Sequence, residues 1–311
     1  MAINTFNLST REGANGLAEK FSAELDKAFV QKAVTGFLAD NVLRAKFVGA
    51  KTVLIPDIDF VGLVDYDRDN GFNRAAVTVA NTPFTMAMDR GRSIQIDRED
   101  ADETGIANLA GQVMGEYVRT KVVPESDAYV LSKLAGIANT NGNTVGWNDA
   151  APYSVFTQMV RAIQDKAGYD EEIVAFVDSA AMAAIDNSEE FSKSVTVSDF
   201  KQGDVSIKVK SINGIALIPV SSARMKSAYD FVKTANNATE GGFTPDEAAK
   251  DIHMLVLPKK AASLVKKTEK MRIWTPEQNL DADAYKFDYR VYYDVFVKKS
   301  ALGTIYASIE A

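Results

Sequence analysis

Two acidic clusters and one histidine are the residues of this chain whose types could serve metal binding or catalysis. The first cluster places Asp65, Asp67 and Asp69 at alternate positions, as at the start of an EF-hand calcium loop. The sixth and twelfth positions of such a loop require Gly and Glu, and here they are Asn70 and Ala76. The solvated tip of a hairpin is therefore favoured over a calcium site.

The second cluster places five carboxylates at 97–103, directly before a long helical pattern. Acidic residues stabilise a helix N-terminus through the helix dipole, so a helix start is favoured over the alternative, a metal-dependent hydrolase. His253 lies in the apolar stretch IHMLVL, whose sequence supplies no acid or nucleophile, and a structural role is favoured. The signatures GxGxxG, GxxxxGK[ST], HExxH and GxSxG are absent as well. We therefore predict no enzyme activity, metal or cofactor.

The composition is that of a water-soluble protein with room for one or two domains. Its 311 residues are 46% hydrophobic and 25% charged, and no apolar run is long enough to predict a membrane span. The first residues lack the pattern of a secretory signal, and the absence of cysteine excludes disulfides and thiolate chemistry. A net charge of −7 argues against a surface that binds nucleic acid. A cytoplasmic protein is expected.

Apolar spacing predicts how the first half of the chain is organised. Residues 17–43 repeat apolar side chains at helical spacing, whereas 51–96 alternate with a period of two in several short runs. The polar centre of this extended segment contains the turn dipeptide Asn70-Gly71, so we expect a long hairpin. A helical pattern follows at 102–138, and Pro124 is expected to kink or divide it.

The second half of the chain reads as an α/β module followed by one long strand. At 285–297 aromatic and β-branched residues fill every odd position, so one face is expected to pack and the other to be solvated or to pair with a neighbour. Six basic residues between Lys259 and Arg272 are read as a solvated helix face, with a stripe that faces DNA as the alternative. The expected elements of the module are a helix at 154–166, a strand at 173–177, a helix at 179–185, a hairpin of 205–210 and 215–220, a strand at 252–257 and a helix at 259–267.

Three segments resemble the major capsid proteins of tailed bacteriophages that share the Hong Kong 97 fold. They are DRGRSIQIDREDADETG (89–105), VVPESDAYVLSKL (122–134) and DYRVYYDVFVKKSALGTIYAS (288–308), and their order and spacing match too. The resemblance covers nearly the whole chain and is weakest at 221–247. It implies a subunit of a virion capsid that forms hexamers and pentamers around double-stranded DNA and assembles in the bacterial cytoplasm. An encapsulin, a bacterial compartment of the same fold that houses an enzyme, is the alternative.

The resemblance also implies an α+β fold made of five parts. These are an N-terminal arm at 1–47, a hairpin called the E-loop at 48–96, a peripheral domain with a long spine helix at 97–150, an α/β axial domain at 151–270 and a strand at 271–311 that returns to the peripheral domain.

Two departures from the family set further expectations. Some relatives begin with a cleaved scaffolding region, whereas here the arm begins at once, so a separate scaffolding protein is expected beside portal and decoration proteins. Other relatives cross-link through a hairpin lysine. No lysine lies between Lys51 and Lys121, so a non-covalent shell is expected.

The hairpin is expected to lie across an adjacent subunit. A two-stranded hairpin is marginal by itself in water, and this one has few apolar residues at its tip. Polar contacts to the neighbour are therefore predicted. The residues expected to make them are Asp65, Asp67, Arg68, Asp69, Arg74, Arg90 and Arg92.

Overall fold

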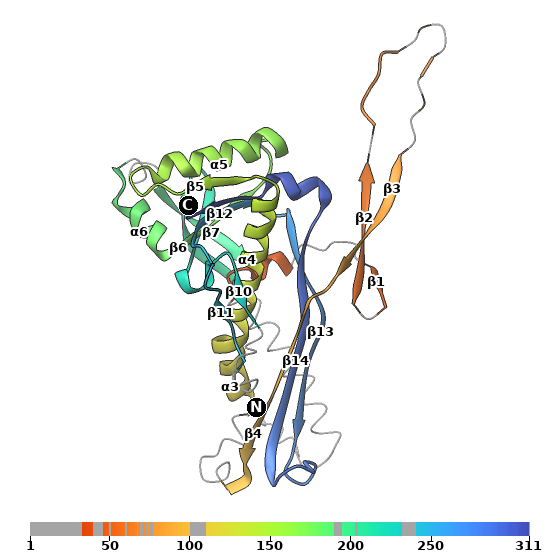
Figure 1. The fold of residues 1–311 in the computed structure, drawn as a ribbon, viewed down its shortest axis with the longest axis vertical. Helices are drawn as coiled ribbons and strands as arrows, with labels where there is room; N and C mark the ends of the chain where they lie inside the picture. The colour runs from red at the N-terminus through yellow and green to blue at the C-terminus, as the bar shows by residue number, and fades with distance from the viewer. Residues whose placement is uncertain are drawn as a thin grey trace, which may run out of the picture.

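The computed structural model is a mixed α and β protein, as expected, with a long hairpin that projects from the body (Figure 1). The sequence's wider division into five parts stays a prediction. The structure describes residues 33–39, 46–49, 51–59, 61–66, 68, 71–72, 74, 77–99, 110–189, 195–202, 205–231 and 241–310.

A long helical column runs through the middle of the molecule (Figure 1). It consists of α3 (Ala110–Tyr117), a π-helical turn η3 (Val118–Val122) and α4 (Val123–Thr140). The predicted effect of Pro124 is a local change of pitch instead of a break. Because proline cannot donate a hydrogen bond and its ring crowds the preceding turn, the backbone widens just before it. The N–H of Val123 accordingly bonds the carbonyl of Val118, five residues back.

A three-stranded antiparallel sheet lies beside this column, in the order β13 (Ala262–Trp274), β14 (Ala284–Val297), β4 (Met88–Asp97). The helix predicted at 259–267 is wrong, because β13 pairs with β14 along its whole length. The register shifts between Lys266 and Thr268, and this bulge interrupts the alternation that would have identified a strand.

The last long strand, β14, is confirmed, but its second face is not solvated throughout. Lys286, Asp288 and Arg290 are partly or fully exposed, as predicted, whereas every residue from Val291 to Val297 is buried. The base of the projecting hairpin covers this half of the strand, as the apolar cluster described below shows.

A seven-stranded sheet forms the upper part of the body (Figure 1). Its helices α5 (Pro152–Ala167) and α6 (Ser179–Asn187) pack on one face, and α4 packs on the other. All six residues of its central strand Ile173–Asp178 are buried, since both faces are covered. The strand order is β5 (Thr144–Gly146), β15 (Tyr306–Ile309), β12 (Ile252–Pro258), β6 (Ile173–Asp178), β9 (Ile215–Val220), β8 (Val205–Ile212) and β7 (Val195–Gln202).

The sequence predicted this module well. Both helices, the central strand and the strand at 252–257 are confirmed. The hairpin of β8 and β9 turns at Asn213 and Gly214, whose φ angles of 53° and 81° are those of the tight turn that the dipeptide indicates. Short elements complete the body: η4 (Ser222–Arg224), β10 (Tyr229–Asp230), β11 (Thr244–Pro245) and η5 (Lys299–Thr304).

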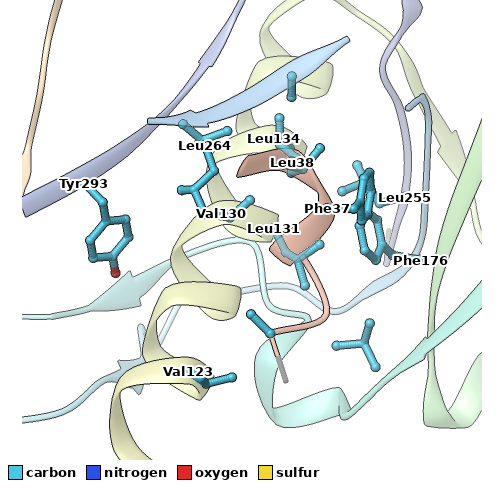
Figure 2. Packing of buried hydrophobic residues seen from close by; sticks show 14 of the residues in the cluster. Phe37, Leu38, Val123, Val130, Leu131, Leu134, Phe176, Leu255, Leu264 and Tyr293 are labelled. Carbon is cyan, nitrogen blue, oxygen red and sulfur yellow. The ribbon is translucent and has the colours of Figure 1, made fainter. Parts of the chain in front are cut away.

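The core brings the start of the described chain against α4 and the large sheet (Figure 2). Phe37 and Leu38 of the 3-10 helix η1 (Gly36–Ala39) pack beside Leu131, and the ring of Phe37 stacks on that of Phe176 at 5.9 Å. The sequence predicted α-helix across 17–43. Residues 33–39 instead form a turn and this short 3-10 helix, and most of the remaining prediction lies outside the described residues.

Asp127 of α4 holds this segment. Its fully buried carboxylate accepts the backbone N–H groups of Val34 and Thr35 at 3.1 Å each and the Thr35 hydroxyl at 2.7 Å. Arg224 donates to it from the other side at 3.2 Å. Burial raises the pKa of Asp127, while these donors act in the opposite direction.

The projecting hairpin consists of β2 (Thr52–Asp59), β3 (Thr78–Thr85) and the chain between them, with β1 (Lys46–Val48) paired to the outer side of β2. This confirms an extended hairpin within 51–96, although it ends at Thr85, and residues 88–96 are extended as β4, which pairs with β14 in the body. Gly71 lies near the tip with a φ of 81°, whereas Asn70 is outside the described residues.

Candidate interaction surface

The projecting hairpin carries most of the exposed apolar surface. Among the described residues, eleven large hydrophobic side chains are exposed, and seven of them lie between β2 and the middle of β3. Leu63 is 105% exposed and Phe72 85%, so the described part of the chain covers little of either side chain. We call these seven residues the apolar strip: Val61, Leu63, Val64, Tyr66, Phe72, Val77 and Val79.

The apolar strip does not form a core of its own. Tyr66 and Phe72 contact each other, with their rings edge to face at 5.0 Å, but both remain exposed. Large apolar side chains gathered in an exposed position on one projecting element are typical of interaction sites. The sequence signal that would have identified it is the short run Val61-Gly62-Leu63-Val64, which has no charged residue.

The polar residues predicted to contact a neighbour lie on the same hairpin. Asp65, Arg68 and Arg74 are exposed, whereas Asp67 and Asp69 lie outside the described residues. The structure therefore brings charged and apolar side chains to one projecting tip. A contact of these charged residues with a neighbour stays a prediction.

Arg90 and Arg92, also predicted contacts, lie on β4 in the body. The guanidinium of Arg90 pairs with Glu125 of α4 at 2.6 Å and donates to the carbonyl oxygens of Phe231 and Gly242. Arg90 thus ties β4 to α4 inside its own subunit, which leaves the exposed Arg92 more accessible from outside. A contact between subunits stays a prediction for both.

The base of the projecting hairpin is fixed to the body by an apolar cluster. Val53, Ile55 and Met86 pack against Tyr292 and Phe296 of β14. The base of the hairpin is therefore seated on β14, whereas its described outer residues project away from the body (Figure 1).

His253 has an acid beside it that the local sequence did not reveal. Its Nδ1 lies 3.6 Å from Oδ2 of Asp178, and its ring stacks on Trp147 at 5.1 Å. Asp178 caps α6 by accepting the N–H of Ala181 at 2.6 Å, and burial raises its pKa. Ser222 bonds Asp178 and Ser179 and makes no bond to the imidazole, so the group lacks the nucleophile–base contact of a catalytic triad.

The acidic and basic clusters have ordinary structural roles where they are described. Oδ1 of Asp97 accepts the N–H of Glu99, which fits the predicted helix start, although most of that cluster lies outside the described residues. Of the basic residues, Lys259 pairs with Glu172, Lys266 with Glu269, and Lys267 bonds the carbonyl of Gly49. They belong to a turn and a strand, so the solvated helix face predicted for them is wrong.

Metal-binding and membrane-spanning features are absent from the described part of the chain. It contains no group of three or more His, Asp or Glu side chains that could hold a metal ion. No helix described in it is long and apolar enough to cross a membrane. A cavity of about 640 Å³ lies between α5 and the turn at Gly214, with a mixed lining that includes Arg161, Tyr169 and Glu172.

The fold itself has clear relatives among solved structures, although no family model and no curated protein sequence matches the chain. A chain from Gordonia phage Cozz has a TM-score of 0.55 at 11% identity, with 83% of this chain and 81% of that chain covered. The capsid structure of cyanophage P-SCSP1u gives 0.54 at 13% identity, with 86% and 85% covered. The capsid structure of Staphylococcus phage Andhra gives 0.51 at 9% identity, with 86% and 82% covered. This chain therefore has the fold of phage capsid subunits.

Proposed function

We propose that this protein is the major capsid protein of a tailed bacteriophage, a structural subunit without enzymatic activity that forms hexamers and pentamers around double-stranded DNA. The observation that carries the proposal is the apolar strip, exposed on a hairpin that projects from a body with a phage capsid fold. A second copy of the chain is the partner that a self-assembling shell provides.

The parts of the subunit follow from the family resemblance. Within a Hong Kong 97-type fold, the projecting hairpin is the E-loop, and α3 to α4 form the spine helix of the peripheral domain. The seven-stranded sheet with α5 and α6 belongs to the axial domain, which surrounds the centres of hexamers and pentamers in that family. Residues from both ends of the described chain pack in one core with α4, which would support the peripheral and axial parts together.

The E-loop would make a head-to-tail contact, which closes into a ring when the rotation between subunits permits. The apolar strip would supply most of the binding free energy, because burial of a large apolar side chain contributes about 1.5–3 kcal/mol. Exposed ion pairs contribute about 0–1 kcal/mol each. Asp65, Asp67, Arg68, Asp69 and Arg74 would therefore set the register of the contact, with Arg92 and Arg90 at its edge.

The partners beyond the shell follow from the same resemblance. Packaged DNA would be enclosed without sequence-specific binding, which suits a subunit with a net charge of −7. A separate scaffolding protein, a portal and decoration proteins would take part in assembly in the bacterial cytoplasm, and the mature location would be the virion capsid.

Negative-stain microscopy of the purified, concentrated protein tests the proposal directly. Shells, rings or curved sheets are expected, because the apolar strip has to be covered by another copy. Small separate particles at high concentration would contradict it. Particles that carry a copurified enzyme instead of DNA would identify the encapsulin alternative.

The shell is expected to be held without covalent cross-links. The projecting hairpin has no lysine after Lys51, so the side chain used for cross-linking in some relatives is missing. Intact particles boiled in detergent should therefore run as a single band near 33.8 kDa on a denaturing gel. A ladder of multimers would show that this prediction is wrong.

A further inference from the structure

Met86 and Ala87 join the end of β3 in the projecting hairpin to the start of β4 in the body. β3 ends at Thr85, still paired within the hairpin, and β4 begins at Met88, opposite Tyr293 of β14. The chain crosses from one sheet to the other between these points. The direction of the hairpin therefore depends on how these two residues are held.

Asp294 holds Ala87 at the end of the β4–β14 ladder. Because the last pair is Met88 with Tyr293, the next residue of β14 is Asp294, and its Oδ2 accepts the N–H of Ala87 at 2.9 Å. Where the pairing of β4 with β14 ends, a side-chain carboxylate thus accepts the backbone N–H in place of a backbone carbonyl. Hydrogen bonds to a charged acceptor are shorter and stronger than neutral ones, which favours a fixed geometry here.

The second oxygen of Asp294 is bound by α4. It accepts the Tyr129 hydroxyl at 2.9 Å and the Lys133 ammonium at 2.5 Å. Burial and the neighbouring carboxylate both raise the pKa of Tyr129, so its phenol stays protonated and donates. Asp294 is completely buried, whereas the Lys133 side chain is 32% exposed. One carboxylate therefore connects the crossing point, β14 and α4.

Met86 is held independently. Its carbonyl accepts the Tyr292 hydroxyl at 3.2 Å, and its N–H donates to the carbonyl of Lys51 at 2.9 Å. The apolar cluster around Tyr292 resists removal of the hairpin, but apolar contacts are not directional. Hydrogen bonds are directional, so the angle of the hairpin is set chiefly by the bonds at the crossing point.

We propose that Asp294 is a positioning residue for shell assembly, which fixes the direction in which the hairpin presents its apolar strip to the next subunit. This inference rests on the proposed function. In Asp294→Ala, the Ala87 N–H and the Tyr129 hydroxyl lose their acceptor, and Lys133 loses its charge partner. Asp294→Asn keeps the side-chain shape and one acceptor oxygen but not the charge.

Distance measurements in the unassembled subunit test the proposal without requiring a shell. The chain has no cysteine, so Asn81→Cys on β3 and Thr140→Cys at the end of α4 accept two spin labels without competing sites. Both positions are exposed. The parent should give a narrow distance distribution, and Asp294→Ala should shift and broaden it. The Ala87 amide should also exchange with solvent about tenfold faster or more, since its buried acceptor is lost.

Asp127→Asn is the matched control. Like Asp294 of β14, Asp127 of α4 has a fully buried carboxylate, but its partners are residues 34–35 and Arg224, away from the hairpin. The control variant should lower stability and leave the distance distribution unchanged. If Asp294→Ala does not fold, Asp294→Asn carries the test. A folded Asp294 variant with the parent's distribution would overturn the proposal, whereas a parent that never forms shells would overturn the proposed function instead.

Discussion

Shell assembly is expected to fail when Leu63 and Phe72 are both replaced by serine. Both side chains are almost fully exposed in the subunit, so the change removes little that stabilises its fold. If a neighbour buries them, the loss is roughly 3–6 kcal/mol for each hairpin contact. A loss of that size raises the protein concentration needed for assembly about 100-fold or more. Light scattering against concentration measures the effect, and circular dichroism shows whether the subunit stays folded.

Two comparisons separate apolar burial from other causes. Leu63→Met with Phe72→Tyr keeps most of the apolar area and should assemble nearly as the parent does. Arg68→Ala with Arg74→Ala removes the predicted polar contacts and should weaken assembly by a smaller amount, because exposed ion pairs contribute little. If the arginine variant were more damaging than the serine variant, the contact would be mainly polar, as the sequence alone suggested.

Asp127→Ala is expected to release the segment at 33–39 and to lower the free energy of unfolding by roughly 3 kcal/mol or more, since a buried charged acceptor with several donors is lost. Two backbone N–H groups and the Thr35 hydroxyl would remain buried without this acceptor, and Arg224 would lose its partner. Urea denaturation followed by tryptophan fluorescence measures the change in stability.

Limited proteolysis shows which part of the chain is released in Asp127→Ala. Cleavage at 33–39 should become faster in Asp127→Ala, while α4 and β14 stay protected in the same digest. Asp127→Asn keeps one acceptor oxygen and should fall between the alanine variant and the parent. Uniform loss of protection across the chain would mean that the carboxylate supports the whole core and not this segment in particular.

Elements with strong local patterns could be predicted from the sequence. The strand Ile173–Asp178 is a short apolar run buried on both faces, and β14 alternates over most of its length. β13 could not be recognised, because its bulge interrupts the alternation, and because Lys266 and Lys267 follow Lys259 and Lys260 of the preceding turn at a spacing of seven residues, which is typical of a helix. Its strand structure depends on pairing with β14, a contact that local sequence does not encode.

The sequence singled out the charged residues of the projecting hairpin but not the exposed apolar residues beside them. Charged residues such as Asp65 and Arg68 can be recognised as surface residues from the sequence. Leu63 and Phe72 are of the types that usually pack in a core, so the sequence does not show that they are exposed. Whether a leucine is buried depends on what packs over it, and the structure shows that nothing in the described chain does. For the same reason the sequence does not reveal that Asp178 lies beside His253, because the two residues belong to different strands, β6 and β12.

The ten residue pairs between β4 and β14 also determine how the subunit would respond to mechanical load. The hairpin continues directly into β4, so a neighbour that pulls on it pulls along the strand axis. The interstrand hydrogen bonds lie perpendicular to that axis, and they would share the force together in shear instead of opening one after another. A shell under outward pressure from packaged DNA would thus pull this sheet along its strands, the direction in which its hydrogen bonds resist the force together.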